Sequence, residues 1–227
     1  MHNRVTLDHF SHFSHFPMNL KEIRKNYSRE TLSEDSLHDP FPLFEKWLEE
    51  AIEGQANEPT AMMLSTVSAE QQPSSRVVLL KLLTNEGFHF FTNYHSRKGR
   101  EIAANSKVAL LFFWPELERE VRIEGMATFS AKELSDQYFG ERPYESQISA
   151  IVSRQSERVE SRQELERLWR EKSEASKGEK LVRPVEWGGY FVRPDSIEFW
   201  QGRPNRLHDR ILFVKGEVGW IVSRLAP

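Results

Sequence analysis

A rapid succession of short β-rich runs is the feature that most constrains the fold of this chain. Five such runs occur between residues 61 and 129, and the turn-forming triplets Gln-Gln-Pro, Asn-Glu-Gly and Trp-Pro-Glu lie between them. Five strands in about seventy residues favour a β-barrel or a β-sandwich. The runs cover residues 61–67, 76–83, 88–94, 108–114 and 121–129.

Helical patterns flank and interrupt these runs. Residues 39–51 place apolar side chains at helical spacing after an Asp-Pro start, which predicts an amphipathic helix. The sequence therefore predicts a mainly β fold, an antiparallel barrel with helices inserted in its second half. Further helices are expected at 96–105, from 132 to 140 and at 161–175, and further strands at 189–193, 196–200, 206–214 and 220–223.

Length and composition favour one domain. The chain has 227 residues, a net charge of -3 and no cysteine, and it lacks the basic balance of a nucleic-acid-binding protein. No apolar run approaches the length of a membrane span and no signal peptide is visible, so we expect a cytoplasmic protein. Residues 1–19 are predicted to be a flexible arm and residues 20–227 the domain. A metal site at His9, His12 and His15 is the weaker alternative, because these histidines have no carboxylate partner.

A candidate site lies near the C-terminus, where residues 197–202 lead into Arg-Leu-His-Asp-Arg at 206–210. In a strand, alternation would place Arg206, His208 and Arg210 on one face. Like charges at neighbouring same-face positions repel each other, so this face indicates an anionic ligand opposite. A solvated edge strand protected by its charge is the alternative.

Cationic side chains elsewhere are candidates for binding phosphate. The chain has neither G-x-G-x-x-G after a strand nor G-x-x-x-x-G-K-[ST], so we expect side chains to hold any phosphate. Arg76 and Lys81 are five residues apart and would point to opposite faces of an unbroken strand. Arg97 and Lys98 follow Ser96, a candidate helix cap. Ordinary surface charge is the alternative for each group alone, but together they indicate a site for more than one anion.

Neutral and mixed groups extend this set. Gln155 and Ser156 supply hydrogen-bonding groups suited to a phosphate or a polyol. Tyr138, Arg142 and Ser146 recur every four residues and would line one helix face, although the proline after Arg142 makes an unbroken helix doubtful. An exposed helix face is the alternative. Because no Ser-His-Asp order or paired-acid spacing stands out, a cofactor that carries the chemistry is the natural hypothesis.

Motifs along residues 23–227 carry a resemblance to one known family. The most specific are Glu198-Phe199-Trp200-Gln201 and Arg206-Leu207-His208-Asp209-Arg210, supported by Thr92-Asn93, Ser96-Arg97-Lys98 and Gln155-Ser156. With them the chain resembles the pyridoxine/pyridoxamine 5′-phosphate oxidases, which are FMN enzymes. The resemblance implies an antiparallel FMN-binding split β-barrel with inserted helices.

The resemblance also implies partners and site residues. The substrates would be pyridoxine 5′-phosphate and pyridoxamine 5′-phosphate, oxidised to pyridoxal 5′-phosphate with O2 as acceptor and H2O2 as product, in a homodimer with shared sites. Arg206 and His208 would act at the substrate's pyridine ring. FMN would be held by Arg76, Phe91, Thr92, Arg97, Lys98, Glu120, Gln155, Ser156, Trp200 and Arg210. Substrate would be held by Arg24, Tyr27, Lys81, Tyr138, Arg142, Ser146, Arg206 and His208.

One residue departs from the family pattern. Glu120 stands where the family usually has Gln at a flavin-contacting position. A carboxylate cannot donate hydrogen bonds, and its charge disfavours anionic reduced flavin. We therefore expect weaker FMN binding or a lower flavin potential, unless Arg119, Arg122 or a proton on Glu120 compensates. Two other functions remain open at this stage: a flavin- or pyridoxal-phosphate-binding protein with little turnover, and a split-barrel reductase.

Overall fold

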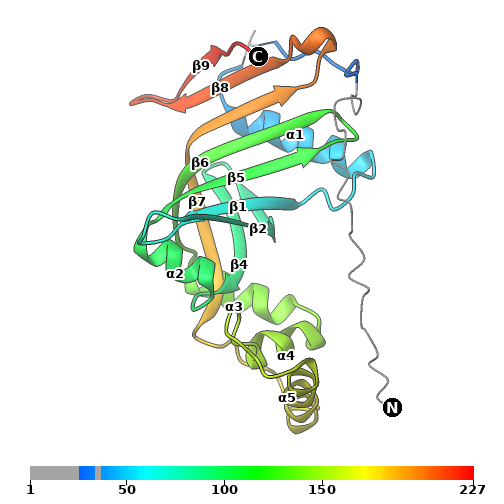
Figure 1. The fold of residues 1–227 in the computed structure, drawn as a ribbon, viewed down its shortest axis with the longest axis vertical. Helices are drawn as coiled ribbons and strands as arrows, with labels where there is room; N and C mark the ends of the chain where they lie inside the picture. The colour runs from blue at the N-terminus through cyan, green and yellow to red at the C-terminus, as the bar shows by residue number, and fades with distance from the viewer. Residues whose placement is uncertain (1–25, 34–36) are drawn as a thin grey trace, which may run out of the picture.

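The fold is a curled antiparallel sheet built around one helix. The computed structural model describes residues 26–33 and 37–227, and nine strands of this described part form one sheet. The order β2-β1-β5-β6-β7-β4-β3 forms the main path, and β8 and β9 extend from β7. Figure 1 shows the sheet curling along its length, with β8 and β9 at one end of the molecule and α3, α4 and α5 at the other. The predicted mainly β split barrel with inserted helices is confirmed.

The elements follow the predicted order closely. The helices are α1 Pro40–Glu53, α2 Arg97–Ala104, α3 Lys132–Glu141, α4 Tyr144–Val152 and α5 Arg162–Ala175, with a 3-10 turn at Pro204–Arg206. The strands are β1 Ala61–Val67, β2 Pro73–Leu79, β3 Leu82–Thr84, β4 Gly87–Asn93, β5 Lys107–Trp114, β6 Arg119–Phe129, β7 Trp187–Gln201, β8 Asp209–Lys215 and β9 Trp220–Arg224. The predicted arm at residues 1–19 lies outside the described residues, as does Arg24.

Helix α1 supplies the centre of the core. Asp39 caps it by accepting a hydrogen bond from the Phe41 backbone N–H at 3.0 Å, and Pro40 occupies the first turn, where its missing donor costs nothing. Phe44 is fully buried, and its ring centroid lies 5.0 Å from those of both Phe88 and Phe112. The amphipathic helix predicted from the sequence is confirmed, and its apolar face holds the curled sheet together.

The long strands β6 and β7 lie side by side in the middle of the sheet. They pair from Arg119 with Gln201 to Phe129 with Tyr190, and one bulge interrupts the ladder between Glu124 and Gly125. A Cβ at Gly125 would lie 2.1 Å from the Arg193 carbonyl oxygen, so the bulge needs glycine there. The two strands expected at 189–193 and 196–200 are therefore one strand that continues past the bulge.

The prediction of one strand over residues 76–83 is wrong in a way that matters for the site. Strand β2 ends at Leu79, and the next two residues change partners. The Leu80 N–H donates to Thr60 O at 2.8 Å, whereas the Lys81 N–H donates to His89 O at 2.9 Å. The chain thus passes from pairing beside β1 to pairing with β4, and the alternation that would separate Arg76 from Lys81 is lost.

The prediction of a strand over residues 206–214 also needs correction. Strand β8 begins at Asp209, and Arg206 ends the 3-10 turn that starts at Pro204. Asn205 and Arg206 have positive φ angles of 57° and 62°. A proline has no backbone donor for a ladder, and left-handed residues cannot continue a strand, so Arg206, His208 and Arg210 do not share a strand face.

A helical excursion joins β6 to β7. Helix α3 ends at Glu141 and α4 begins at Tyr144, so the break falls at Pro143 and the expected single face of Tyr138, Arg142 and Ser146 spans two helices. Trp169 of α5 donates from its indole nitrogen to Ser149 Oγ of α4 at 3.1 Å. Across residues 26–33 and 37–227, no helix combines the length and apolar character needed to cross a membrane.

Candidate functional site

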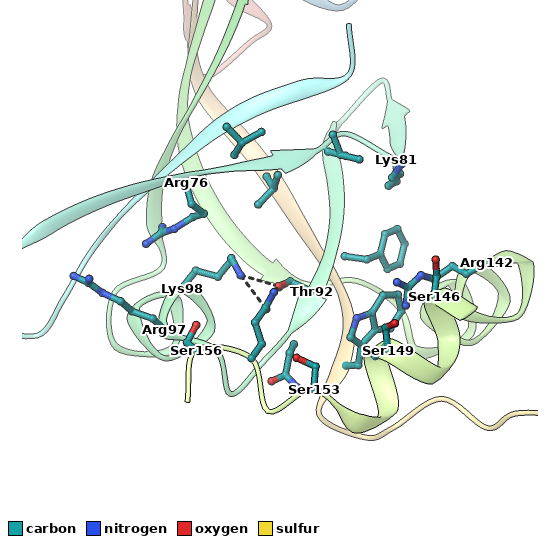
Figure 2. A pocket seen from close by; sticks show the side chains of 18 of the residues that line it. Arg76, Lys81, Thr92, Arg97, Lys98, Arg142, Ser146, Ser149, Ser153 and Ser156 are labelled. Carbon is teal, nitrogen blue, oxygen red and sulfur yellow. Dashed lines mark hydrogen bonds between the residues drawn. The ribbon is translucent and has the colours of Figure 1, made fainter. Parts of the chain in front are cut away.

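A cavity of about 940 Å³ opens between strands β2 and β4 and helices α2, α3 and α4. Its walls carry five cationic side chains, and its described lining residues include no aspartate or glutamate. Figure 2 shows Lys98 and Arg142 on opposite sides of this cavity. Such a lining selects for anionic ligands. The five cations are Arg76, Lys81, Arg97, Lys98 and Arg142.

Among the residues described, only neutral side chains form hydrogen bonds with the buried ammonium group of Lys98. Its Nζ donates to Thr92 Oγ1 and Gln155 Oε1 at 3.0 Å each and lies 3.4 Å from Ser96 Oγ. Burial, helped by the nearby charge of Arg76, lowers the pKa of Lys98 to about 8. An anion placed beside this ammonium would recover the stability that burial costs it. Ser96 also caps α2, as predicted, by accepting from the Gly99 N–H at 3.3 Å.

Arg142, on the opposite side of the cavity, is a second cation without a carboxylate partner among the residues described. Its guanidinium lies over the Trp187 ring, 4.6 Å from the centroid. Its Nη1 atom is buried and has no hydrogen-bond partner among the residues described. Burial lowers the pKa of Arg142, although nearby Tyr138 opposes the shift. A buried donor without a partner is uncommon in native proteins and points to a ligand group at this position.

An aromatic stack forms the wall beside Arg142. The Phe91 and Tyr138 rings stack with centroids 4.1 Å apart, and Tyr138 and Trp187 are nearly parallel at 6.2 Å. Burial raises the pKa of Tyr138, so its hydroxyl stays protonated and can donate a hydrogen bond. With Ser146 on α4, this wall offers two hydroxyls and a guanidinium, a set suited to a phosphate.

A second cluster of predicted site residues lies on the other end of the sheet, at β6, β7 and β8. Glu120 pairs with Trp200, and Trp200 with Arg210, so the three side chains form a row across three strands. The rings of Trp200 and His208 are 4.7 Å apart, and Tyr27 contacts both edge-on at 5.6 Å and 5.7 Å. We call these five residues the Trp200 cluster.

His208 is held in a defined protonation state. The Arg203 backbone N–H donates to His208 Nδ1 at 3.1 Å, which requires a lone pair on that nitrogen. The neutral ring therefore carries its proton on Nε2, which remains free to donate. Burial and the charge of Arg206 lower the pKa of His208, while Asp209 opposes them. Arg206, two residues earlier in the chain, is exposed, and its left-handed backbone conformation is one that a non-glycine residue adopts at a cost.

Comparisons with known proteins cover most residues of both the cavity and the Trp200 cluster. Residues 48–172 match the family model described as pyridoxamine 5′-phosphate oxidase, and residues 187–227 match a pyridoxine 5′-phosphate oxidase C-terminal dimerisation region. The chain belongs to the pyridoxamine 5′-phosphate oxidase family. Members of this family bind FMN, and the protein is an oxidoreductase.

Curated relatives agree over most of the chain. Pyridoxine/pyridoxamine 5′-phosphate oxidase from Burkholderia vietnamiensis is 50% identical over 213 residues, covering 92% of this chain and 99% of the relative. The enzyme of the same name from Rubrobacter xylanophilus is 51% identical, covering 92% and 96%. Each of the two alignments therefore spans most of this chain and most of the relative.

Solved structures carry the same fold. PhzG from Burkholderia lata, determined in complex with tetrahydrophenazine-1-carboxylic acid, superposes with a TM-score of 0.83 at 28% identity, over 88% of this chain and 100% of its own. A pyridoxamine 5′-phosphate oxidase-related, FMN-binding protein from Nostoc punctiforme gives 0.67 at 14% identity, over 85% and 99%, which supports the fold alone.

Within one chain of this oxidase-family protein, the predicted site residues divide into two groups. The cavity brings together Arg76, Lys81, Phe91, Thr92, Arg97, Lys98, Tyr138, Arg142, Ser146, Gln155 and Ser156. The cavity lining does not include Tyr27, Glu120, Trp200, Arg206, His208 or Arg210. Strand β8, which carries Arg210, and helices α3 to α5 lie at opposite ends of the molecule in Figure 1.

Sequence reasoning missed two residues of the cavity region. Trp187 was not among the predicted site residues, yet the Arg142 guanidinium lies over its ring. Glu101 was not singled out, although its Oε1 lies 2.8 Å from Arg97 Nε. The spacing of four residues between Arg97 and Glu101 on a helix is a signal that could have found this pair.

Proposed function

We propose that this protein oxidises pyridoxine 5′-phosphate and pyridoxamine 5′-phosphate to pyridoxal 5′-phosphate with FMN as cofactor. The observation that carries the proposal is a pair of cations on opposite sides of one cavity, the buried Lys98 and the half-buried Arg142, which have no carboxylate partner among the residues described. Two such groups suit two phosphates, one from the flavin and one from the substrate. Relatives about 50% identical that carry this activity in their names support the same substrates.

The residues on the Lys98 side fit a flavin phosphate. This side offers three cations, a threonine and a serine hydroxyl, and the amide of Gln155, which is the donor chemistry that a phosphate and a ribityl chain require. When bound, FMN would supply the acceptor for a hydride from C4′, and O2 would take up the two electrons with two protons as H2O2; the amine substrate would also consume water and release ammonia when its imine hydrolyses. The residues that would hold it from this chain are Arg76, Phe91, Thr92, Arg97, Lys98, Gln155 and Ser156.

The residues on the Arg142 side fit the substrate phosphate. Arg142 supplies a fixed positive charge with an unused donor, and Tyr138 and Ser146 supply hydroxyls beside it. Lys81 reaches the same cavity because β2 ends before it. Binding by these four side chains would orient the substrate by its remote phosphate, which leaves its ring free to lie against the flavin.

We further propose a homodimer in which the Trp200 cluster of one subunit completes the cavity of the other. The match to a dimerisation region over β7 to β9 supports it. A second support is an exposed apolar patch on β1, β2 and β5, where Met63, Val77 and Phe113 are 43%, 62% and 54% exposed. A patch of this kind on a sheet face is typical of an interface between subunits.

In the completed site, Arg206 and His208 would position the reacting end of the substrate. The guanidinium of Arg206 can orient the substituent at C4′ by charge and hydrogen bonding. His208 would donate from Nε2 to a ring substituent, since its Nδ1 already accepts from Arg203. Neither residue needs to act as a nucleophile.

The test is a direct assay of the purified full-length protein. We expect bound yellow flavin and release of peroxide with both phosphorylated substrates when FMN is saturating. Arg142→Ala should abolish most of the turnover, whereas Arg170→Ala, which changes an exposed cation on α5, should leave it intact. Absence of turnover of both substrates would refute the proposal. Flavin binding without turnover would favour a carrier, and activity only with a nicotinamide or deazaflavin donor would favour a reductase.

A further inference from the structure

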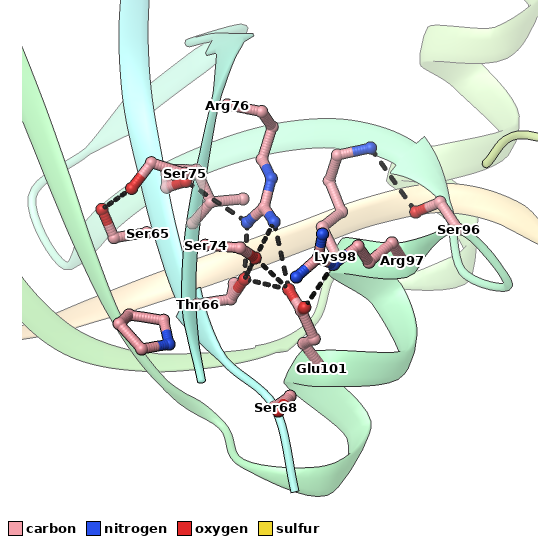
Figure 3. A network of polar contacts seen from close by, with 12 residues as sticks. Ser65, Thr66, Ser68, Ser74, Ser75, Arg76, Ser96, Arg97, Lys98 and Glu101 are labelled. Atoms are coloured by element: carbon pink, nitrogen blue, oxygen red, sulfur yellow. Dashed lines mark hydrogen bonds and ion pairs between the residues drawn. The ribbon is translucent and has the colours of Figure 1, made fainter. Parts of the chain in front are cut away.

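A buried carboxylate lies behind the cationic wall of the cavity. Glu101 of α2 has a side chain only 6% exposed, and Figure 3 shows it between Arg76 and Arg97. Its Oε2 accepts from Ser74 Oγ at 2.8 Å and from Arg76 Nη2 at 3.0 Å, and its Oε1 accepts from Arg97 Nε at 2.8 Å. Thr66 Oγ1 donates to Oε2 as well. One carboxylate thus connects the two guanidiniums that line the Lys98 side.

Glu101 is a permanent anion. Burial alone would raise the pKa of Glu101, but hydrogen bonds from Thr66, Ser74, Arg97 and Arg76 outweigh it and lower the pKa to about 2. The carboxylate therefore stays charged at neutral and mildly acidic pH. Its charge offsets part of the repulsion among the three cations that converge here.

The contacts leave Arg76 and Arg97 in different states. Arg76 Nη1 donates to Leu64 O at 3.3 Å and to Thr66 Oγ1 at 2.5 Å, and its Nη2 donates to Ser74 Oγ at 2.5 Å as well as to Glu101. The outer nitrogens of Arg76 are thus used within the protein, and this residue acts as a fixed charge. Arg97 uses only Nε toward Glu101, and in the described part of the chain its two outer nitrogens have no hydrogen-bond partner.

We propose that Glu101 is a positioning residue for the phosphate of the flavin: it fixes Arg76 and directs the two outer nitrogens of Arg97 toward the cavity. The inference rests on the proposed function, because it takes the flavin phosphate to bind on this side. Glu101 does not line the cavity and need not touch the ligand. It acts through the two arginines, so its removal affects recognition of the phosphate and leaves recognition of the flavin ring unchanged.

The experiment compares two ligands that differ only in the phosphate. The full-length protein, freed of flavin, is titrated with FMN and with riboflavin, and binding is followed by flavin fluorescence. Glu101→Ala should weaken FMN binding about tenfold, the loss of one charge-assisted hydrogen bond to an anion, and should change riboflavin binding less than about twofold. Glu101→Gln keeps an acceptor for one arginine and should recover part of the FMN affinity.

A matched control separates positioning from general disturbance of the sheet. Ser65 on β1 forms a hydrogen bond of 2.8 Å with Ser75 on β2 and does not contact Glu101. Ser65→Ala should therefore leave the affinities for FMN and riboflavin unchanged. Equal losses for FMN and riboflavin in Glu101→Ala, or no loss for FMN, would overturn the inference. If Glu101→Ala does not fold, an unchanged FMN-to-riboflavin ratio in Glu101→Gln overturns it equally. Wild-type protein that binds neither ligand would instead refute the proposed function, and the inference with it.

Discussion

The cavity and the Trp200 cluster contain similar residue types but balance their charges in opposite ways. In the cavity, the buried Lys98 and the half-buried Arg142 make no ion pair with any residue described. Beside the Trp200 cluster, Arg210 Nε lies 2.7 Å from Glu198 Oε1, and Arg122 lies 3.2 Å from the other oxygen of the same carboxylate. Two of the five cavity cations thus have no carboxylate partner among the residues described, whereas the guanidinium of Arg210 in the Trp200 cluster is paired.

This difference indicates what each region recognises. Unmatched buried cations are stabilised by an incoming anion, so the cavity is suited to phosphates. A paired guanidinium and aromatic rings in tilted and edge-on contact offer a preformed surface without a strong net field, which suits the uncharged faces of flavin and pyridine rings. One chain holds the two surfaces apart, and a second copy is the simplest way to bring them together.

The largest expected effect comes from mixing two inactive variants. Arg142→Ala removes a cavity residue and Arg206→Ala removes a residue beside the Trp200 cluster, and each should lower kcat/KM about a hundredfold through lost positioning. If the site is shared, a heterodimer of the two has one site with both residues intact. Unfolding and refolding an equal mixture should then restore about a quarter of wild-type activity, as random pairing requires.

The control for this experiment is a mixture of two cavity variants, Arg142→Ala with Lys98→Ala, in which no site regains both residues. That mixture should show no more than the mean activity of the two variants assayed separately. Activity absent from the Arg142 and Arg206 mixture, with dimers formed, would mean that both residues serve the same subunit's site. A loss of only a few-fold in Arg206→Ala alone would contradict its assignment to the reacting end.

The next largest effect concerns the cavity alone. Lys98→Ala removes a buried ammonium and should weaken FMN binding about 30-fold, within the range for a hydrogen bond to a charged group. Because the pKa of Lys98 is lowered to about 8, FMN affinity of the wild-type protein should also fall as pH rises through that value in the free protein. Titration with FMN between pH 6 and 9 checks both statements. Normal flavin retention by Lys98→Ala would remove it from the phosphate site.

Local patterns predicted those parts of the fold that depend on local interactions. The cap at Ser96 and the helix from Pro40 follow from spacing and turn chemistry, and both are observed. The break after β2 could not be predicted in this way, because it depends on Leu80 and Lys81 finding partners on different strands. The role of Glu101 depends on four partners from three segments, and only the Arg97 pair is local in sequence.

In the candidate site, too, some features could be predicted from the sequence and others could not. Resemblance to the family named the cavity residues, and the cavity gathers them, whereas alternation along a supposed strand wrongly placed Arg206, His208 and Arg210 together. Pro204 precedes the predicted strand at 206–214 and indicates a turn before it, but no sequence pattern showed that this turn extends through Arg206. The separation of Lys98 from Trp200 within one chain had no sequence signal, because alternation and spacing say nothing of which subunit supplies a residue.

A smaller effect should follow the protonation of His208. Its pKa is lower in the folded chain than the value of about 6.5 expected for an unfolded one. The folded state is therefore favoured above that pH and loses this contribution as pH falls, because the protonated ring cannot accept from Arg203. We therefore expect kcat/KM to decrease toward acidic pH, because protonation of His208 loosens the turn that carries Arg206. In His208→Asn this pH dependence should disappear and kcat/KM should fall about tenfold; a pH dependence that persists would assign the titration to another group.

The smallest effect is expected at Glu120. Arg119 cannot neutralise this residue, because its guanidinium turns to the opposite side of the sheet, where it pairs with Glu30 and lies 4.5 Å over Trp47. Burial raises the pKa of Glu120; Arg122 and Arg210 oppose the shift and Glu198 adds to it. Glu120→Gln should bind FMN about threefold more tightly and raise the flavin potential, since an amide can donate and carries no charge.

The pH dependence of that difference separates charge from shape. Protonated Glu120 resembles glutamine, so the wild-type protein and Glu120→Gln should converge as pH falls through the raised pKa and differ most above it. Measuring FMN affinity and flavin potential of both proteins across this range decides the point. Equal values at all pH would mean that the charge of Glu120 is not felt by the flavin, and that the row from Glu120 to Arg210 does not contact it.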